Sequence, residues 1–441
     1  MKLYVGIDLG STTTKAVVMG EGAVILGKGI TNSRSNYDTA CAIAKTEAFI
    51  DTRFSLFRRH LAAGPGNGVD LDRFLASLEA NFRLQQFLNQ LQHLRETALL
   101  EAEGKRYQAV QRTLAEKLRA MFDQIQAEAP ALYAVGSARR SDFFRDLAGS
   151  AYMRLAETAA EAEGVTYNLL VGIYDKCIIR VENAVIDLTF ESNIGQALER
   201  TFAAFPQMDA RDRTKLADAT RSATEQLLDV AGSVGTGYGR ARLPFAKEQI
   251  RSEILCHGLG AHYMFPKTTT VLDIGGQDTK AIQVDAEGIV TAFQMNDRCA
   301  AGCGRYLGYI ADELNLGVQE LGPLALKSEK SVRINSTCTV FAGAELRERL
   351  NNGERREDIL NGLHRAIILR AMSLLARSGG VSDEFTFTGG VANNQAAVKA
   401  LVGLIEENYG KRVINISPNS IYTGAIGAGL FAMRDSQGAA R

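Results

Sequence analysis

Two short apolar runs open the chain, and a polar turn separates them. Leu3 to Leu9 and Thr14 to Met19 carry mainly aliphatic, β-branched or aromatic residues, and Gly10 to Thr13 lie between them. Apolar runs of this length that are bounded by a glycine turn are typical of β-strands. The pattern therefore predicts a strand, a tight turn and a second strand.

The middle of the chain has a different texture. Leu71 to Glu128 contains almost no glycine, and its apolar residues recur mostly at steps of three and four, punctuated by Gly104 and later by Pro130. This period is that of an amphipathic helix. Tyr167 to Phe190 alternates more like a strand, and it predicts a β-hairpin that turns near Glu182-Asn183.

From about residue 208 onward, strands and helices alternate. A helix is expected over Leu216–Val230. The further strands are predicted at Thr268–Asp273, Lys280–Val284, Glu384–Thr388 and Val413–Ile416, and the further helices at about 303–315, 340–351, 357–377, Ala396–Glu407 and from Gly424. The expected organisation is a first α/β lobe from 1–40 and 208–267, a mainly helical insertion at 41–207, and a second α/β lobe at 268–441.

Composition narrows the class of protein. The 441 residues contain 50 Lys+Arg and 50 Asp+Glu, so the chain lacks the basic surplus that favours nucleic acid or anionic membranes. No apolar run approaches the roughly 20 residues of a membrane span. The start, MKLYVGIDLG, lacks the pattern of a secretion signal. We expect a cytoplasmic protein that binds neither membrane nor nucleic acid.

One design occurs twice. GIDLGSTTTKAVV at Gly6–Val18 and VLDIGGQDTKAIQV at Val271–Val284 each contain a strand that ends in Asp, a glycine turn, Thr-Lys and a second strand. The matched pairs are Asp8 with Asp273, Gly10 with Gly275, Thr14 with Thr279, and Lys15 with Lys280. Two conventional hairpins would be the structural explanation, but four matched polar or glycine positions favour a shared chemical task.

That task is phosphate binding. Glycine turns bring backbone N–H groups close to an anion, hydroxyls add donors, and a strand-end Asp can hold Mg²⁺ through water. Asp8 and Asp273 are the candidates for organising the metal and the attacking water. The candidate phosphate-binding residues are Gly10, Ser11, Thr12, Thr13, Lys15, Gly275, Gly276 and Gln277.

Two other glycine segments could also bind a nucleotide. FTFTGGVANN at Phe385–Asn394 ends a strand and opens a helix, so Gly389 and Gly390 could lie close to a nucleotide base or ribose. GAVILGKG at Gly22–Gly29 nearly matches a phosphate-binding loop, but glycine replaces the Ser/Thr that would bind magnesium. We therefore reject that second segment.

The order of the three turns resembles the superfamily of acetate kinase, sugar kinases, heat-shock chaperone ATPases and actin. The resemblance covers about 1–40 and 208–435. It implies an α/β fold of two ribonuclease H-like lobes that close on ATP and Mg²⁺, here with a large helical insertion.

Three of the six cysteines fall within forty residues. Cys299 lies in NDRCAAGCGRYL and Cys338 in NSTCTVFAGAEL, each expected just before a helix. A helix N-terminus lowers the pKa of a thiol, and thiolates bind iron–sulfur clusters. Two well-placed thiols suggest that two chains share a four-thiolate [4Fe–4S] cluster. Cys303 could be a third ligand, although packing is favoured, and buried structural cysteines remain the alternative.

The segments around Cys299 and Cys338 resemble the activator family of 2-hydroxyacyl-CoA dehydratases and benzoyl-CoA reductases. Four other segments resemble the same family: GIDLGSTTTK, GYGR, SEILCHGLGA and LDIGGQDTKAI. The resemblance implies ATP hydrolysis coupled to electron transfer from a reduced ferredoxin. It also implies one [4Fe–4S] cluster held between two subunits, with Cys299 and Cys338 as ligands. Cys256 and His257 match the family without a ligand role, and we expect them to be core or coupling residues.

The insertion sets the chain apart from the small homodimeric activators. It resembles that of the larger ATP-binding subunit of ATP-dependent benzoyl-CoA reductases, which implies a smaller homologous partner and substrate-reducing subunits that bind benzoyl-CoA. The insertion could dock those subunits or be a plain surface subdomain. The alternatives are a homodimeric dehydratase activator, a sugar or acetate kinase without a cluster, and a regulatory ATP-binding protein without catalysis.

Overall fold

The chain forms two compact units. The computed structural model describes all residues except 34–35, 62–69, 138–142, 161–163, 185, 240, 242, 298–302, 315, 331, 335–338 and 439–441. The first unit contains Met1–Ala48 and Leu228–Arg441, and the second contains Phe49–Leu227. The sequence placed these two divisions after residues 40 and 207.

A four-stranded sheet begins the first unit, with the order β3-β2-β1-β4. Its strands are β1 (Lys2–Leu9), β2 (Thr13–Met19), β3 (Ile25–Asn32) and β4 (Asp229–Thr236). The first two are the predicted strands. The predicted helix over Leu216–Val230 is wrong at its end, because helix α7 (Ala210–Glu225) stops and β4 starts at Asp229. Two glycines inside β4 weaken its strand signal in the sequence.

A five-stranded sheet with the order β7-β6-β5-β8-β9 forms the second lobe of this unit. Its strands are β5 (Thr270–Ile274), β6 (Thr279–Val284), β7 (Val290–Asn296), β8 (Glu384–Thr388) and β9 (Val413–Asn415). The four predicted strands are confirmed, and β7 is an additional edge strand. β5 pairs with β8 in parallel and with β6 in antiparallel orientation.

The helices of the second lobe follow the predicted positions closely, except for α10, which the sequence did not predict. They are α9 (Gly304–Glu313), α10 (Val318–Ala325), α11 (Thr339–Asn351), α12 (Arg356–Ser378) and α13 (Gln395–Tyr409). α12 and α13 share one core with the inward side chains of β8, Phe385 and Phe387. In the described part of the chain, α12 alone is long and apolar enough to span a membrane, but 67% of its apolar window is buried inside the protein.

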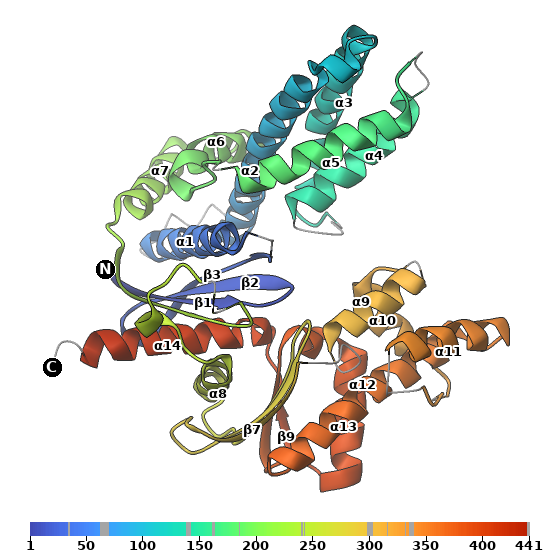
Figure 1. Cartoon of the computed structure of the whole chain (residues 1–441). Coiled ribbons are helices and arrows are strands. Elements are labelled where there is room, and N and C mark those ends of the chain that lie inside the picture. Colours follow the sequence, from blue (N-terminus) through green and yellow to red (C-terminus); the bar gives the residue numbers. More distant parts are fainter. Residues whose placement is uncertain are drawn as a thin grey trace. The chain divides into compact units, whose positions relative to one another are not determined.

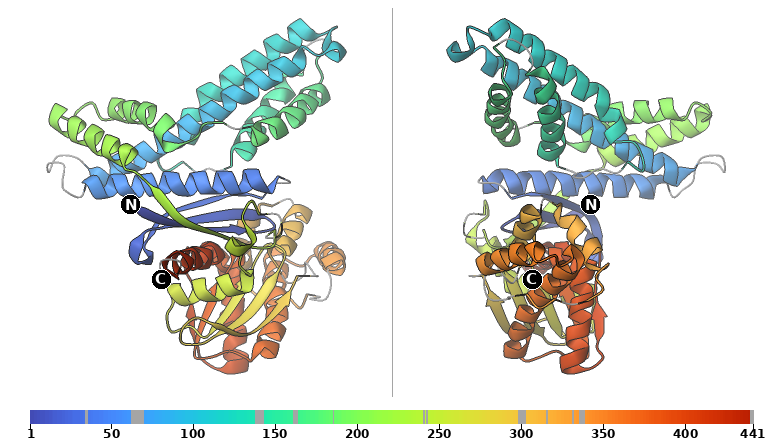
Figure 2. Two further views of the ribbon diagram at one scale, coloured as in Figure 1. Left: turned by 60° about the vertical axis from the view of Figure 1, so that its left-hand side comes forward. Right: turned by 90° about the vertical axis from the view of Figure 1, so that its right-hand side faces the viewer.

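Two helices, α8 and α14, each pack against the sheet that they do not follow in the sequence. α8 (Glu253–Met264) follows the first sheet in sequence, yet its Ile254 and Ala261 pack against β5 and β6. α14 (Thr423–Gly438) follows the second sheet, yet its Ala425 and Ile426 pack against β1 and β2 of the first sheet. Figure 1 shows α14 beneath the first sheet and α8 beside the second, and Figure 2 shows the start of α1 and α14 on opposite faces of the first sheet.

α8 and α14 cross at very short range. A β-carbon on Gly427 would lie 1.9 Å from the carbonyl oxygen of Cys256, and one on Gly260 would lie 2.1 Å from that of Thr423. Only glycine permits such contact between helix backbones. The crossing therefore joins the two lobes through backbone rather than through interlocking side chains.

The second unit contains helices and connecting turns but no strand among its described residues. Its helices are the end of α1 (Tyr37–Leu61), α2 (Leu71–Ala102), α3 (Gln111–Leu132), α4 (Phe144–Ala159), α5 (Tyr167–Asn183), α6 (Phe190–Ala204) and α7. The predicted hairpin at Tyr167–Phe190 is wrong, because most of it is α5. The buried residues of α5, Leu170, Ile173, Tyr174, Cys177, Ile178 and Val181, recur at helical steps, and Thr166 caps the helix.

Candidate functional site

The two matched segments form matched hairpins. In β1–β2, Asp8 lies directly across from Lys15, and in β5–β6, Asp273 lies directly across from Lys280. Each Asp-bearing strand also has a parallel partner on its other side, β4 or β8. The repeated sequence therefore produces a repeated local structure, with each carboxylate at the end of a buried central strand.

The turns of the two hairpins face each other. A β-carbon on Gly276 would lie 2.2 Å from Thr12 Oγ1 and 3.5 Å from Ser11 Oγ. The predicted residues Gly10–Thr13 and Gly275–Gln277 thus belong to opposed turns, and all of them are at least partly exposed. Glycine backbone and hydroxyl groups from both hairpins thus come together at one partly exposed place, which suits the binding of phosphates.

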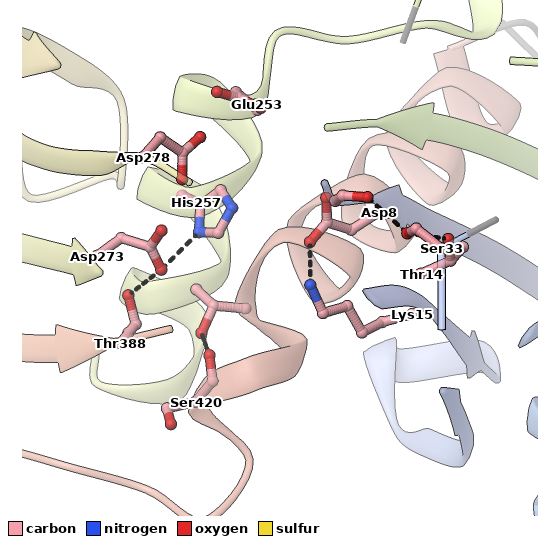
Figure 3. Close-up of polar contacts among 12 residues, drawn as sticks. Asp8, Thr14, Lys15, Ser33, Glu253, His257, Asp273, Asp278, Thr388 and Ser420 are labelled. Atoms are coloured by element: carbon pink, nitrogen blue, oxygen red, sulfur yellow. Dashed lines mark hydrogen bonds and ion pairs between the residues drawn. The ribbon is translucent and has the colours of Figure 1, made fainter. Parts of the chain in front are cut away.

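The carboxylate of the first hairpin has few contacts. Lys15 Nζ lies 3.5 Å from Asp8 Oδ2. Behind the turn, Ser33 Oγ donates to the Gly10 carbonyl at 2.6 Å and also contacts Thr14 Oγ1 at 2.9 Å. Figure 3 shows Lys15 reaching towards Asp8, with Ser33 next to Thr14. This arrangement fixes the turn backbone, and among the described residues it gives the Asp8 carboxylate one long ion-pair contact.

The second hairpin is held by a dense buried network. Asp273 Oδ1 accepts a 2.9 Å hydrogen bond from Thr388 Oγ1, and Asp273 Oδ2 accepts one of 3.2 Å from Lys280 Nζ. Lys280 Nζ is also 2.9 Å from Asp278 Oδ1 and 3.9 Å from Glu253 Oε1. One buried ammonium group therefore faces three carboxylates.

Electrostatics in this network keep opposite charges paired. Burial alone would raise the pKa of Asp273, but His257 and Lys280 outweigh it and hold that pKa well below its usual range. Burial alone would lower the pKa of Lys280, but the surrounding carboxylates raise it. For Glu253 burial dominates, and its pKa is raised. Asp273 and Lys280 are therefore ionised at neutral pH.

The third glycine turn lies beside the second hairpin. A β-carbon on Gly389 would come within 2.3 Å of the Ile274 carbonyl oxygen, at the end of β5. Just beyond the turn's short helix, Asn394 caps α13 and contacts His364 Nε2 at 3.0 Å. The predicted nucleotide turn Gly389-Gly390 and the second phosphate turn are thus neighbours, as a single bound nucleotide would require.

The sequence did not reveal the role of α8 in this site. His257 Nδ1 lies 3.2 Å from Asp273 Oδ1, close enough for an ion pair although not aligned as a full hydrogen bond. Glu253 lies one helical turn earlier, so both side chains project from the same face of α8 (Figure 3). The signal that could have found them is their i, i+4 spacing on a helix whose other residues, apart from His262, are mainly apolar or glycine.

Both predicted cluster cysteines, Cys299 and Cys338, lie outside the described residues, as does Arg240 of the GYGR segment. The helix α11 starts directly after Cys338, whereas α9 starts at Gly304 rather than directly after Cys299. Among the described residues, no group of three or more His, Cys, Asp or Glu side chains is arranged so that it could hold a metal ion. Thiols ahead of two helices have the donor chemistry that an iron–sulfur cluster requires.

Cys303 lies inside the described part. The sequence predicts a helix from about residue 303, and Cys303 is the fully buried N-cap residue of α9. The first amides of α9 donate to the turn of the second hairpin: Gly304 N–H donates to the Gly275 carbonyl at 2.8 Å, and Arg305 N–H donates to the Gly276 carbonyl at 2.7 Å. This turn and the start of α9 are therefore joined through backbone hydrogen bonds.

Comparisons with known proteins agree with this geometry. The profile of the BadF/BadG/BcrA/BcrD ATPase family matches residues 5–432. The (R)-2-hydroxyglutaryl-CoA dehydratase activating ATPase of Acidaminococcus fermentans is 44% identical over 47% of this chain and 76% of its own length. The activator of lactoyl-CoA dehydratase of Anaerotignum propionicum is 41% identical over 47% of this chain and 78% of its own length.

A more distant relative is a subunit of the benzoyl-CoA reductase of Thauera aromatica, which is 33% identical over 40% of this chain and 62% of its own length. Among solved structures, component A of the A. fermentans dehydratase superimposes with a TM-score of 0.51 at 25% identity, covering 99% of this chain and 100% of that one. The Clostridium difficile 2-hydroxyisocaproyl-CoA dehydratase activator, solved with ADPNP, gives a TM-score of 0.52 at 21% identity, over 99% and 97% of the two chains. The predicted two-lobed fold is confirmed.

Proposed function

Because the chain belongs to the BadF/BadG/BcrA/BcrD ATPase family, we propose that it binds Mg²⁺-ATP between its two hairpins and couples ATP hydrolysis to electron transfer into a partner enzyme. The observation that carries the nucleotide site is the approach of Gly276 to Thr12, which sets two exposed glycine turns against each other. Phosphoryl transfer to water needs mainly positioning and charge stabilisation, and this arrangement supplies both.

The two hairpins would have different roles in ATP hydrolysis. Asp8, whose contact with Lys15 is 3.5 Å long, is able to hold a hydrated Mg²⁺ or orient the attacking water, and Lys15 would follow the phosphates. Asp273 already has Thr388, Lys280 and His257 around its two oxygens. We assign Asp273 the task of fixing the second turn and orienting any water that bridges to the metal.

Coupling would run through α9. The carbonyls of Gly275 and Gly276 accept hydrogen bonds from the first amides of α9, so a nucleotide that shifts this turn would also shift the start of α9, which follows Cys299 in the sequence. A [4Fe–4S] cluster, when bound by Cys299 and Cys338 of two protomers, would supply the one-electron carrier. Lowering its potential by ~300 mV would need roughly 7 kcal/mol, which is on the scale of ATP hydrolysis.

Two partner enzymes fit this chemistry. The higher identity to dehydratase activators, 44% and 41%, favours a 2-hydroxyacyl-CoA dehydratase that receives a single initiating electron. The helical unit Phe49–Leu227 favours a benzoyl-CoA reductase, where a smaller homologous subunit shares the cluster, ferredoxin donates, and other subunits reduce the ring. In either case the acyl-CoA site lies on the partner, and the protein would work in the cytoplasm.

The deciding experiment starts with anaerobic purification of the native complex. We expect a brown, iron-containing protein whose partner chains identify the enzyme. A reductase should consume about two ATP-driven electrons for each ring that it reduces, because the ring takes up two electrons, whereas a dehydratase should consume far less than one electron per turnover. An iron-free protein that phosphorylates a sugar or acetate would contradict the proposal. So would a protein whose ATPase does not respond to a reduced donor, as a purely regulatory ATP-binding protein would behave.

The ligand assignment needs its own variant. Cys338→Ser should lose iron and donor-dependent electron transfer, while ATP binding at the hairpins is retained. The matched control is Cys177→Ser in the second unit, whose buried thiol lies on α5 and should leave the iron content unchanged. A full complement of iron in Cys338→Ser would exclude Cys338 as a ligand.

A further inference from the structure

A buried imidazole stands between the two phosphate hairpins. His257 is 7% exposed, and its Nδ1 lies 3.2 Å from Asp273 Oδ1 of the second hairpin. Its other nitrogen points towards the first hairpin. A β-carbon on Gly424, at the start of α14, would lie 2.8 Å from His257 Nε2 and 3.0 Å from Asp8 Oδ2. The absence of a side chain at Gly424 therefore leaves the ring and the Asp8 carboxylate facing across a narrow gap.

The charges around this ring come from every adjoining element. Asp273 and Lys280 face it from β5 and β6, Asp8 from β1, and Glu253 from its own helix. Burial alone would lower the pKa of His257, but Asp273 outweighs it and the pKa is raised. An apolar residue would fill a helix crossing at lower cost, because buried charges are expensive to desolvate. A histidine suits this position because each of its two ring nitrogens can interact with a carboxylate, one from each hairpin.

The existing contact is incomplete. Nδ1 reaches Asp273 without good hydrogen-bond alignment, and no described group bonds to it as a hydrogen-bond partner. Catalytic hydrogen bonds are often long or misaligned before the ligand binds and become shorter in the complex. The ring sits on α8, whose backbone crosses α14 at Gly427, so a small shift of the two helices would change both of its distances.

We propose that His257 is a positioning residue that links the two hairpins: its Nδ1 fixes Asp273, and on closure its Nε2 donates to Asp8 Oδ2. The imidazole then bridges one carboxylate from each lobe and sets the spacing at which they meet the phosphates. This contact also requires Gly424, because any larger residue there would lie between His257 Nε2 and Asp8 Oδ2. The inference rests on the ATPase function proposed above.

The test is steady-state ATP hydrolysis by the full-length, anaerobically purified protein. In His257→Asn the side-chain amide reproduces Nδ1 but not Nε2. We expect normal thermal unfolding, a KM for ATP within about threefold of wild type, and a kcat lowered by roughly tenfold. The control is His262→Asn on the same helix, which packs near Gly288 and should change none of these values.

A second substitution tests the gap itself. Gly424→Ala should lower kcat by a similar factor, and the double variant His257→Asn/Gly424→Ala should be no worse than either single variant, because both remove the same contact. Additive losses would overturn the bridge, and so would a wild-type kcat in His257→Asn, which a merely structural histidine predicts. If the wild-type protein itself does not hydrolyse ATP, the proposed function fails instead.

Discussion

The two hairpins of the first unit share one sequence pattern but have different surroundings. In the first, the Asp8 and Lys15 side chains are 6% and 12% exposed and separated by 3.5 Å. In the second, Asp273 and Lys280 are 2% and 3% exposed and separated by 3.2 Å, and Lys280 also faces Asp278 and Glu253. The difference has two sources: Asp278, which lies in the turn of the second hairpin, and α8, whose Glu253 and His257 reach the charged pair.

Matching motifs therefore need not have matching roles. A lysine with a long contact at a partly exposed turn can change partner when an anion arrives. A lysine enclosed by three carboxylates cannot leave without exposing buried charge. We therefore interpret the first hairpin as the side that responds to the nucleotide and the second as the rigid support.

The largest expected difference is in stability. Lys280→Met leaves three carboxylates without their cation and should destabilise the protein by about 3–5 kcal/mol, as loss of one partner from a buried ion pair does. Lys15→Met should cost less than about 1 kcal/mol, because its contact is long and partly exposed. Urea unfolding monitored by circular dichroism measures both. Equal losses in the two variants would remove the distinction between the hairpins.

For the rate of ATP hydrolysis, we expect changes in the first hairpin to have the larger effect. Asp8→Asn should lower kcat for ATP by roughly a hundredfold while leaving unfolding within about 1 kcal/mol of wild type, because the group acts on the nucleotide more than on the fold. Asp273→Asn should primarily lower stability. ATPase assays paired with thermal unfolding separate these outcomes, and an active Asp8→Asn protein would remove Asp8 from the site.

A pH dependence follows from the buried pair. The pKa of Asp273 is depressed, so its contribution to stability is present above its unfolded pKa of about 3.9 and is lost as pH falls through the folded value. The pKa of Lys280 is raised, so its contribution is present below about 10.4 and is lost as pH rises through the folded value.

The free energy of unfolding of the wild-type protein should therefore be flattest between these limits. It should decline below about pH 4 more steeply than that of Asp273→Asn, which lacks the titrating carboxylate. Urea titrations at a series of pH values measure this. If the free energy of unfolding of the two proteins falls equally steeply below about pH 4, Asp273 is not paired in solution.

The smallest effect is expected where the turns meet. Gly276→Ala places a methyl group against the hydroxyl of Thr12, a side chain that can rotate, so stability should change by less than about 1 kcal/mol. Turnover should fall only severalfold, with most of the change in the KM for ATP. Thr12→Ala in the same background should restore part of the loss. An unchanged KM in Gly276→Ala would indicate that the two turns do not meet on the nucleotide.

The parts of the molecule that depend on local pattern could be predicted from the sequence. Apolar runs and glycine turns located β1, β2, β5, β6 and β8, and the repeated Asp, Thr and Lys correctly paired the two hairpins. The error at α5 has a local cause, since Ile178, Ile179 and Val181 are β-branched and imitate a strand, whereas the burial of this segment follows a helical period.

The unequal surroundings of the hairpins could not be predicted in this way. They depend on which helix packs on which sheet, and α8 and α14 each pack on the sheet of the lobe opposite to the one that the sequence order suggests. His257 was visible in the sequence, but its contact with Asp273 depends on that exchange. Long-range packing decides such contacts, and the periodicity of a single sequence does not encode it.

The helix exchange also constrains how the chain is made. The apolar faces of Tyr4 and Val17 are covered by α14, so the first sheet stays open until residues 423–438 have left the ribosome. A nascent chain of several hundred residues would thus carry an incomplete amino-terminal lobe, which is the kind of exposed surface that recruits chaperones. Completion of the first lobe must therefore wait for the synthesis of α14, long after that of β1 and β2.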